Sequence, residues 1–193
     1  MIRSHSNVSL KLSVKPLKQY PWYLRPFFWS QRRRYGRELL PGLLWGRSPL
    51  VFMCVALLYG SLDRRRSPIE PVLRSLVTVR VSQINSCVFC MDINSMTLAR
   101  RCGGMDKVLA LKNWRESSLF DGRERVALEY AEAMTDSRLG VEDELRGRLL
   151  RQFDEDAVVE LTGLIAFQNL SSKFNSAIGV PAQGFCRLVD ETK

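Results

Sequence analysis

The first 37 residues contain no Asp or Glu, although they hold nine Lys or Arg residues. The remaining 156 residues carry 20 basic and 20 acidic side chains, so the formal net charge of +9 belongs to the N-terminal segment alone. A surface that follows phosphates normally spreads its basic residues over folded elements as well, so the charge distribution argues against nucleic-acid binding. We expect instead a solvated arm whose aromatic residues pack on a neighbouring surface: Trp22, Tyr23, Phe27, Phe28 and Trp29.

The sequence also lacks an uncharged run long enough to cross a bilayer. The longest, Ser48 to Leu62, has 15 residues, whereas a transmembrane helix needs about 20. Arg47 interrupts the apolar segment from Leu39 to Leu62, and Pro41 and Gly42 break its earlier part. We therefore predict a buried core helix there and no transmembrane segment. The N-terminal segment has no apolar stretch followed by a small-residue cleavage site, so we expect no secretory signal and a cytoplasmic location.

Cysteine and histidine are scarce, which limits the metal and disulfide chemistry open to the chain. An odd number of five cysteines, in a chain long enough to form its own core, disfavours a structural disulfide framework. A zinc site needs a second cysteine pair or histidines, and the single histidine lies in the N-terminal segment, so neither a metal nor an organic cofactor is expected. Cys54 lies in an apolar run and is expected in the core. Cys102 and Cys186 have no partner at an informative spacing, which leaves Cys87 and Cys90 as the one motif.

Apolar periodicity and helix punctuation predict an all-α fold. Ser48-Pro49 is expected to begin a helix that continues to Tyr59, and Ser67-Pro68 another that continues to about Ile84, because Ser suits an N-cap and Pro the first helical turn. We divide the chain into a basic, aromatic arm (1–47) and one helical domain (48–193). The remaining predicted helices span about 86–102, ending at Gly103-Gly104, and 121–135, 141–153 and 154–178.

The motif Cys87-Val88-Phe89-Cys90 has the spacing at which two thiols close a small disulfide and reopen it reversibly. We expect it at the start of a helix, where unpaired backbone N–H groups and the helix dipole favour a thiolate over a thiol. The thiolate is the form that attacks a peroxide or a disulfide. Two buried cysteines without a redox role remain the alternative. No βαβ pattern surrounds the motif, so a thioredoxin fold is not predicted.

The segments 73–76 and 80–90, which end in this motif, resemble the signature of the carboxymuconolactone decarboxylase and AhpD-like proteins. The segments 120–135 and 160–170 resemble the next helix and the closing helix of that family, so the resemblance covers roughly residues 48–180. It implies an all-helical core that assembles into homo-oligomers. It also implies peroxide reduction by a cysteine pair that a dithiol or thioredoxin-like partner reduces again.

The resemblance assigns roles to the two cysteines, with Cys90 as the peroxidatic and Cys87 as the resolving residue. Helix-terminus reasoning alone favours Cys87, which is nearer the N-terminus of the helix. The family's proton relay uses a Glu and a His at the positions of Ser75 and Asn94. Neither residue can act as a base near neutral pH, so relay catalysis is in doubt.

Four further polar residues near the motif are candidates for supporting roles. Arg80 can stabilise a thiolate or pair with Glu124 or another acid, while Gln83 and Asn169 are expected to form hydrogen bonds that fix helix contacts. Asp92 is expected to be a solvated first-turn acid, because on a helix it points ~200° away from the second cysteine.

The leading prediction is therefore a thiol-disulfide oxidoreductase or peroxidase that uses Cys90 and Cys87 on a small-molecule peroxide. One alternative is a cofactor-free decarboxylase-like enzyme acting on a small carboxylate, with Arg80 as the anion anchor. The resemblance disfavours true lactone decarboxylation, which does not depend on the cysteine pair. The other alternative is a non-enzymatic redox-sensing or structural oligomer whose arm binds a protein or an anionic surface. The apolar, aromatic segment from Pro21 to Leu62 predicts a homo-oligomer in either case.

Overall fold

The computed structural model describes residues 12–186, and this part of the chain contains helices and no strands. The all-α prediction is therefore confirmed. The α-helices are α1 (Arg25–Tyr35), α2 (Leu40–Trp45), α3 (Pro49–Leu62), α4 (Pro71–Ile84), α5 (Val88–Cys102), α6 (Asp106–Ala110), α7 (Gly122–Thr135), α8 (Asp143–Gln152) and α9 (Glu155–Ala177). Short 3-10 helices are Leu17–Gln19, Trp22–Leu24 and Leu111–Asn113.

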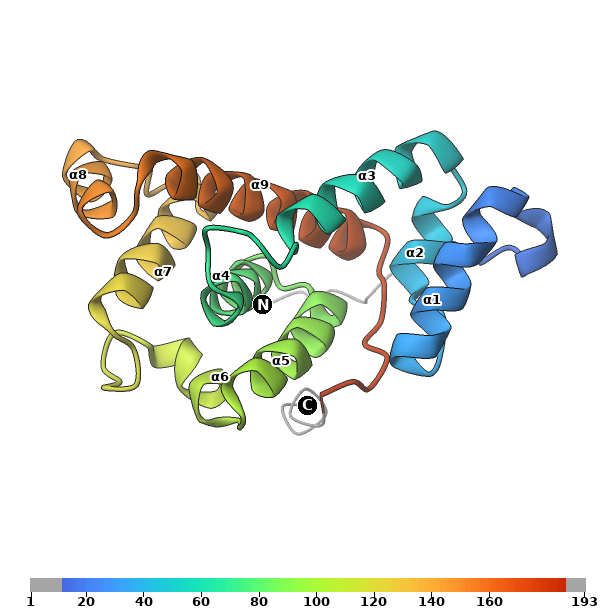
Figure 1. Ribbon diagram of the computed structural model, residues 1–193. Coiled ribbons are helices and arrows are strands. Elements are labelled where there is room, and N and C mark those ends of the chain that lie inside the picture. Colours follow the sequence, from blue (N-terminus) through green and yellow to red (C-terminus); the bar gives the residue numbers. More distant parts are fainter. Residues whose placement is uncertain (1–11, 187–193) are drawn as a thin grey trace, which may run out of the picture.

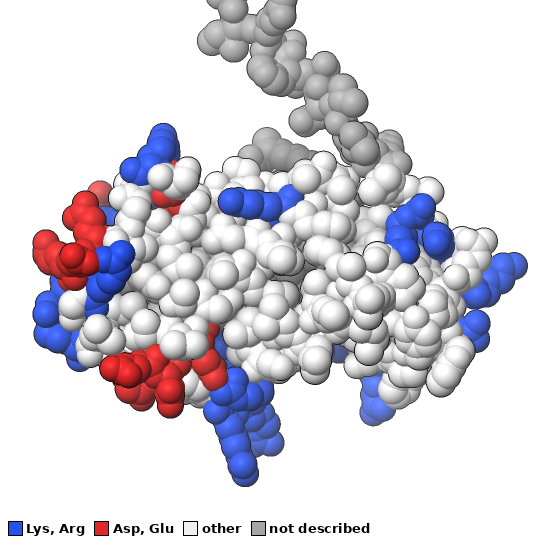
Figure 2. Space-filling view, turned by 90° about the horizontal axis from the view of Figure 1, so that it is seen from above, with Lys and Arg blue, Asp and Glu red and all other residues white. Residues whose placement is uncertain are grey.

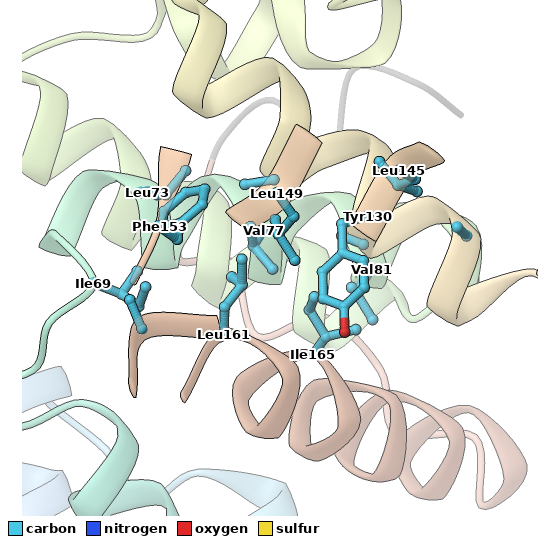
Figure 3. Close-up of a cluster of buried hydrophobic side chains, with 14 residues drawn as sticks. Ile69, Leu73, Val77, Val81, Tyr130, Leu145, Leu149, Phe153, Leu161 and Ile165 are labelled. Carbon is cyan, nitrogen blue, oxygen red and sulfur yellow. The ribbon is translucent and has the colours of Figure 1, made fainter. Parts of the chain in front are cut away.

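Helix α4 lies at the centre of the bundle and packs against α5, α7 and α9 (Figure 1). Its residues Leu73, Val77 and Val81 are buried against α7, α8 and α9 (Figure 3). Leu76 and Val79 point toward a second cluster that involves α5 and α6. Burying each such side chain contributes about 1.5–3 kcal/mol, so α4 is held from two sides. Its start differs from the prediction, because the helix begins at Pro71 and not at Ser67-Pro68.

The N-terminal segment, which we expected to be a solvated arm with packed aromatic residues, contains helices α1 and α2. Phe28 is 2% exposed and packs with Phe27 against Phe52 of α3, with the Phe27 and Phe52 ring centroids 4.6 Å apart. Such edge-to-face aromatic pairs contribute about 0.5–1.5 kcal/mol beyond their buried area. Trp22 and Trp29 are 77% and 63% exposed, so the predicted packing of the aromatic residues is confirmed for only part of the set.

Helix α3 is not the buried core helix that the sequence predicts. Its uncharged side chains surround the whole helix, yet only Phe52 and Leu62 are buried, while Leu50 and Leu57 are 78% and 73% exposed. Cys54 is also exposed, against the prediction that it lies in the core. The face over α3 and α9 is largely uncharged, with most charged groups near its edges (Figure 2). None of the described helices combines the length and apolar character that crossing a membrane requires.

Candidate active site

The predicted cysteine motif lies where the chain turns from α4 into α5. Ser86 has a left-handed φ of 51°, a conformation that is uncommon for a residue other than glycine and that recurs at functional sites. Cys87 is the N-cap of α5, and its Sγ accepts a hydrogen bond from the Cys90 backbone N–H at 3.2 Å. Gly103, with a φ of 73°, ends the helix as predicted. The cysteines therefore lie in the first turn, where the backbone N–H groups and the helix dipole favour a thiolate.

Cys87 and Cys90 form a disulfide and are almost fully buried, at 1% and 2% exposure. Cys90 Sγ accepts a hydrogen bond from Asn175 Nδ2 at 3.3 Å. Asn175, from the C-terminal end of α9, is itself 1% exposed, and its Oδ1 has no hydrogen-bond partner among the described residues. An amide that reaches a sulfur in this way can stabilise a thiolate when the disulfide opens.

A cavity of about 240 Å³ lies beside the disulfide, and Cys90 lines it whereas Cys87 does not. Its walls come from α1, α2, α3, α5 and α9, so the N-terminal segment forms part of the site. Arg34 is the one charged residue among those that line it. Each helix contributes at least one aromatic ring, in chain order Tyr35, Trp45, Tyr59, Phe89 and Phe167.

Tyr59 is a cavity residue whose acidity is changed by its surroundings. Burial raises its pKa to about 12, and the nearby Tyr35 and Asp63 act in the same direction. The hydroxyl therefore stays protonated at neutral pH and can donate a hydrogen bond, but it cannot serve as a base.

Asn94 lines the cavity and belongs to a neutral hydrogen-bond network. Its Nδ2 donates to Ser82 Oγ at 3.1 Å, and Gln168 Nε2 donates to the same oxygen at 3.1 Å. Ser82 Oγ in turn donates to the Thr78 carbonyl at 2.6 Å. Ser82 and Gln168 are buried. The position at which related sequences are expected to carry a His is therefore fixed by amide and hydroxyl groups that do not titrate near neutral pH.

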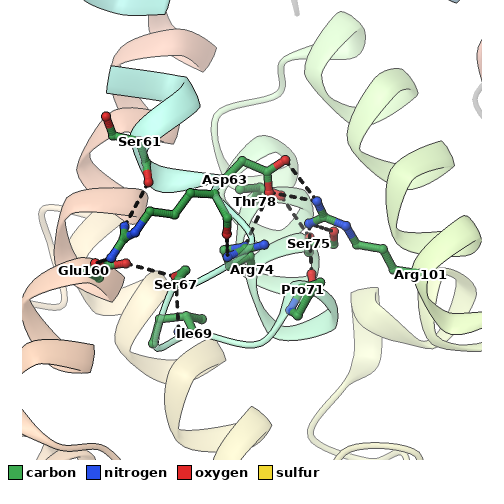
Figure 4. Close-up of polar contacts among 11 residues, drawn as sticks. Ser61, Asp63, Ser67, Ile69, Pro71, Arg74, Ser75, Thr78, Arg101 and Glu160 are labelled. Carbon is green, nitrogen blue, oxygen red and sulfur yellow. Dashed lines mark hydrogen bonds and ion pairs between the residues drawn. The ribbon is translucent and has the colours of Figure 1, made fainter. Parts of the chain in front are cut away.

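Ser75 lies outside the large cavity and next to a charged cluster that includes Asp63 and Arg101 (Figure 4). Arg101 donates to Ser75 Oγ at 2.9 Å and binds both carboxylate oxygens of Asp63, at 2.8 and 3.1 Å. A smaller cavity of about 40 Å³ is lined by Ser75, Asn94, Asp63 and Arg101 together. The fold thus brings the two positions of the expected relay to one cavity, which has room for at least one water molecule.

Arg80 and Gln83 do not line either of these cavities. Arg80 Nε donates a hydrogen bond to Glu132 Oε1 at 2.6 Å, and Arg80 Nη1 donates one to Gln83 Oε1 at 2.9 Å. Burial opposes ionisation of Glu132, but hydrogen bonds from Arg115 and Trp114 and the charge of Arg80 outweigh it and lower the pKa of this carboxyl. The predicted pairing of Arg80 with an acid is confirmed, with Glu132 as the partner. Its role as the anchor for a small carboxylate stays a prediction, and in this structure the guanidinium contacts Glu132 and Gln83.

Asp92 is fully buried, so the prediction of a solvated acid is wrong. Its two carboxylate oxygens accept hydrogen bonds from the backbone N–H groups of Gln183 at 2.8 Å and Cys186 at 2.6 Å. The Gln183 side chain in turn bonds the Leu40 N–H at 2.8 Å and the Glu38 carbonyl at 3.2 Å. Asp92 of α5 and the Gln183 side chain therefore hold the segment after α9 in place between α5 and the N-terminal helices.

The residues that the sequence analysis missed are Arg34, Gln168 and Asn175. The predicted structural role of Asn169 is confirmed, since it bonds Asn85, Thr135 and the Ile165 carbonyl. For Gln168 and Asn175 of α9, the sequence does contain a signal in the spacing of its polar residues. Gln168, Ser172 and Asn175 follow one another at intervals of four and three residues, so they share one face of the helix, and all three are buried.

Comparisons with known proteins agree with this architecture. The model of the carboxymuconolactone decarboxylase family matches residues 53–133. The Escherichia coli (strain K12) protein YnjA is 49% identical over 180 residues, which cover 93% of this chain and 99% of that protein.

Two solved structures have the same fold. One is the debrominase Bmp8 in complex with 2,3,4-tribromopyrrole, with a TM-score of 0.82 at 21% identity over 98% of this chain and 100% of that one. The other is the alkylhydroperoxidase AhpD core of a peroxidase-related protein from Ralstonia eutropha JMP134, with a TM-score of 0.80 at 19% identity over 90% and 93% of the two chains. With its CxxC disulfide at the start of α5, the chain belongs to the carboxymuconolactone decarboxylase family and has the AhpD-like fold.

Proposed function

We propose that this protein is a thiol peroxidase in which Cys90 reacts with a small organic hydroperoxide and Cys87 resolves the product. The observation that carries the proposal is that the disulfide lies beside a cavity that Cys90 lines and Cys87 does not. A substrate in the cavity therefore reaches Cys90 first. The fold agreement with AhpD-like peroxidase-related proteins supports the same chemistry.

The reaction begins with the reduced protein. The Cys90 thiolate attacks the terminal oxygen of the hydroperoxide, the O–O bond breaks, and the departing alkoxide takes up a proton to leave as an alcohol. Cys90 is then a sulfenic acid, and the Cys87 thiol attacks its sulfur to form the disulfide and release water. An external dithiol, or a thioredoxin-like protein, reduces the disulfide by exchange and restores both thiols.

Two kinds of group favour the Cys90 thiolate in this scheme. Asn175 Nδ2 already donates to Cys90 Sγ, and the first turn of α5 adds the field of the helix dipole. Asn94 forms part of the cavity wall and is held there by its hydrogen bond to Ser82. Ser75 and the Arg80–Gln83 pair can affect the Cys90 sulfur only from a distance. Because these side chains carry no base, we expect slower peroxide reduction than a complete relay provides.

A redox-sensing protein is the second candidate, and the neutral network around Asn94 favours it. Without a nearby acid, the alkoxide from a peroxide must take its proton from water, whereas a thiolate leaving from a disulfide needs none. The Cys87–Cys90 pair can then change its redox state by exchange with a partner dithiol while reacting slowly with peroxide.

Single cysteine variants separate the two functions. The variant Cys87→Ser, mixed with cumene hydroperoxide and the sulfenic-acid reagent dimedone, should carry the adduct on Cys90, whereas Cys90→Ser should carry none on Cys87. An adduct on Cys87 of equal yield would reverse the assigned roles. Wild-type protein that consumes no hydroperoxide, yet forms the disulfide with oxidised dithiothreitol, would refute the peroxidase and favour the redox sensor.

We further propose that the protein is a homo-oligomer that covers the exposed face of α3. Leu50, Met53 and Leu57 are 78%, 45% and 73% exposed, and Val159 of α9 is 70% exposed. A second copy of the chain would remove this apolar area from water, which favours association by roughly 25 cal/mol for each Å² buried. The largely uncharged surface in Figure 2 supports the same interface.

A further inference from the structure

The cavity beside Cys90 has a size and composition that restrict what it can bind. Its volume is about 240 Å³, while an apolar cavity of about 150 Å³ is known to hold one benzene molecule. The space therefore suits a substituted benzene or a small two-ring compound. Aromatic side chains from five helices line it, and flat rings pack on such side chains at offset or edge-to-face angles.

The charges around the cavity are one-sided. Arg34 lines it, and no Asp, Glu or Lys does. The Arg34 guanidinium lies 5.4 Å from the centre of the adjacent Tyr35 ring and has no carboxylate within ion-pair distance among the described residues. Other arginines of the bundle, such as Arg80 and Arg101, are paired with acids. Arg34 is exposed, which places its cation at the rim of the cavity and not in its interior.

The field of Arg34 also reaches the α3 wall. Burial is the main cause of the raised pKa of Tyr59, and Tyr35 and Asp63 act in the same direction, while the positive charges of Arg34 and Arg101 oppose the increase. Arg34 and Cys90 line the same cavity, and Arg34 is the one charged residue in that lining. An anionic group near Arg34 gains a charge-assisted hydrogen bond without meeting a repelling carboxylate among the lining residues.

We propose that this cavity binds a small aromatic monoanion, with its ring among the aromatic walls and its acid group on Arg34. The hydroperoxide reduced by Cys90 then belongs to the same class, an aromatic ring that carries one carboxylate. This assignment of substrate class rests on the proposed peroxidase function, whereas the binding itself does not.

Binding is tested on the oxidised wild-type protein, in which no turnover occurs. Calorimetric titrations compare 1-naphthoate with 1-naphthalenemethanol, which has the same ring without the charge, and with octanoate, which has the charge without a ring. We expect 1-naphthoate to bind about fivefold more tightly than the alcohol, since an exposed ion pair contributes up to ~1 kcal/mol. Octanoate should bind more weakly than 1-naphthoate.

The variant Arg34→Gln should lower the affinity for 1-naphthoate to that for the alcohol and leave the alcohol unaffected. Arg33→Gln is the matched control, because Arg33 lies on the same helix over Trp29 and does not line the cavity. In the reduced protein, 1-naphthoate should slow the alkylation of Cys90 by iodoacetamide. Equal binding of acid and alcohol, an equal effect of both arginine variants, or unprotected Cys90 would overturn the proposal.

Steady-state kinetics with two hydroperoxides distinguish a failure of the proposed binding site from a failure of the proposed peroxidase function. The KM for 4-(2-hydroperoxypropan-2-yl)benzoate should be about fivefold below that for neutral cumene hydroperoxide, and Arg34→Gln should abolish this difference in KM. Turnover of both compounds at equal KM would refute the substrate class and leave the peroxidase intact. Selective binding of 1-naphthoate without any turnover would refute the peroxidase and leave the binding site intact.

Discussion

Replacing Asn175 by leucine removes the side-chain hydrogen bond to Cys90 Sγ. It also removes Asn175 Oδ1, a buried oxygen that has no hydrogen-bond partner among the described residues. A hydrogen bond to a charged group contributes about 1.5–3 kcal/mol, and a sulfur acceptor at 3.3 Å should fall at the low end. Since one pKa unit corresponds to about 1.36 kcal/mol, the pKa of the Cys90 thiol should rise by about one unit in the variant.

The stability of the Asn175→Leu variant should change little by comparison. Removing a donor and an unsatisfied acceptor together, in favour of an apolar side chain of similar size, can be nearly neutral. Asn169→Leu is the matched control on the same helix, because Asn169 bonds Thr135, Asn85 and a backbone carbonyl but no sulfur. It should lose about 2 kcal/mol of unfolding free energy and leave the pKa of Cys90 unchanged.

The assay is the pH dependence of iodoacetamide alkylation in the reduced protein, with Cys54, Cys102 and Cys186 replaced by serine and Cys90 followed by peptide mapping. Urea unfolding of the same variants gives the stability. A Cys90 pKa that is the same in wild type and Asn175→Leu, or that shifts equally in Asn169→Leu, would refute the role given to Asn175.

Three other outcomes follow from the structure. Installing a relay with Ser75→Glu and Asn94→His should raise the rate constant of peroxide consumption at least tenfold. General acid–base catalysis typically accelerates a reaction by about 10²–10⁴-fold, and Arg101 is in place to hold the new carboxylate. No gain in a stopped-flow measurement would contradict this prediction. Asp92→Asn should lower the free energy of unfolding, measured in urea, by about 2 kcal/mol, since one of the two backbone N–H groups loses its acceptor. Unchanged stability would contradict the role of Asp92 in holding the segment after α9. Light scattering at micromolar concentration should give a mass above the 22.2 kDa of one chain, reduced by Leu57→Glu, whereas a wild-type monomer would refute the homo-oligomer.

The elements that the sequence predicted well are those with local signals. The helix predicted over about 86–102 and ending at Gly103-Gly104 agrees with α5 within a few residues, and the three- and four-residue spacing of apolar side chains defines α4, α7 and α9. Helices α1 and α2 were missed because their stability depends on distant contacts. Phe27 and Phe28 have their partner Phe52 on α3, and no local pattern shows this contact.

The candidate site was predictable only where its residues are neighbours in sequence. The cysteine pair is local, whereas the cavity combines residues of five helices. Helix geometry placed Asp92 away from Cys90, but the two N–H groups that it binds lie 91 and 94 residues further along the chain. Apolar residues around all of α3 usually indicate burial in a core. The exposure of Leu57 shows that this inference does not distinguish a core from a surface that another chain can cover.

The central claim is that Cys87 and Cys90 form a disulfide that opens and closes as the protein reduces a hydroperoxide. The most direct measurement adds half an equivalent of cumene hydroperoxide to the fully reduced protein, counts the remaining thiols and maps the linked peptides by mass spectrometry. We expect two thiols to disappear for each hydroperoxide consumed, both from a Cys87–Cys90 linked peptide, with recovery after dithiothreitol. Free Cys87 and Cys90, alongside oxidised Cys102 or Cys186, would contradict the claim.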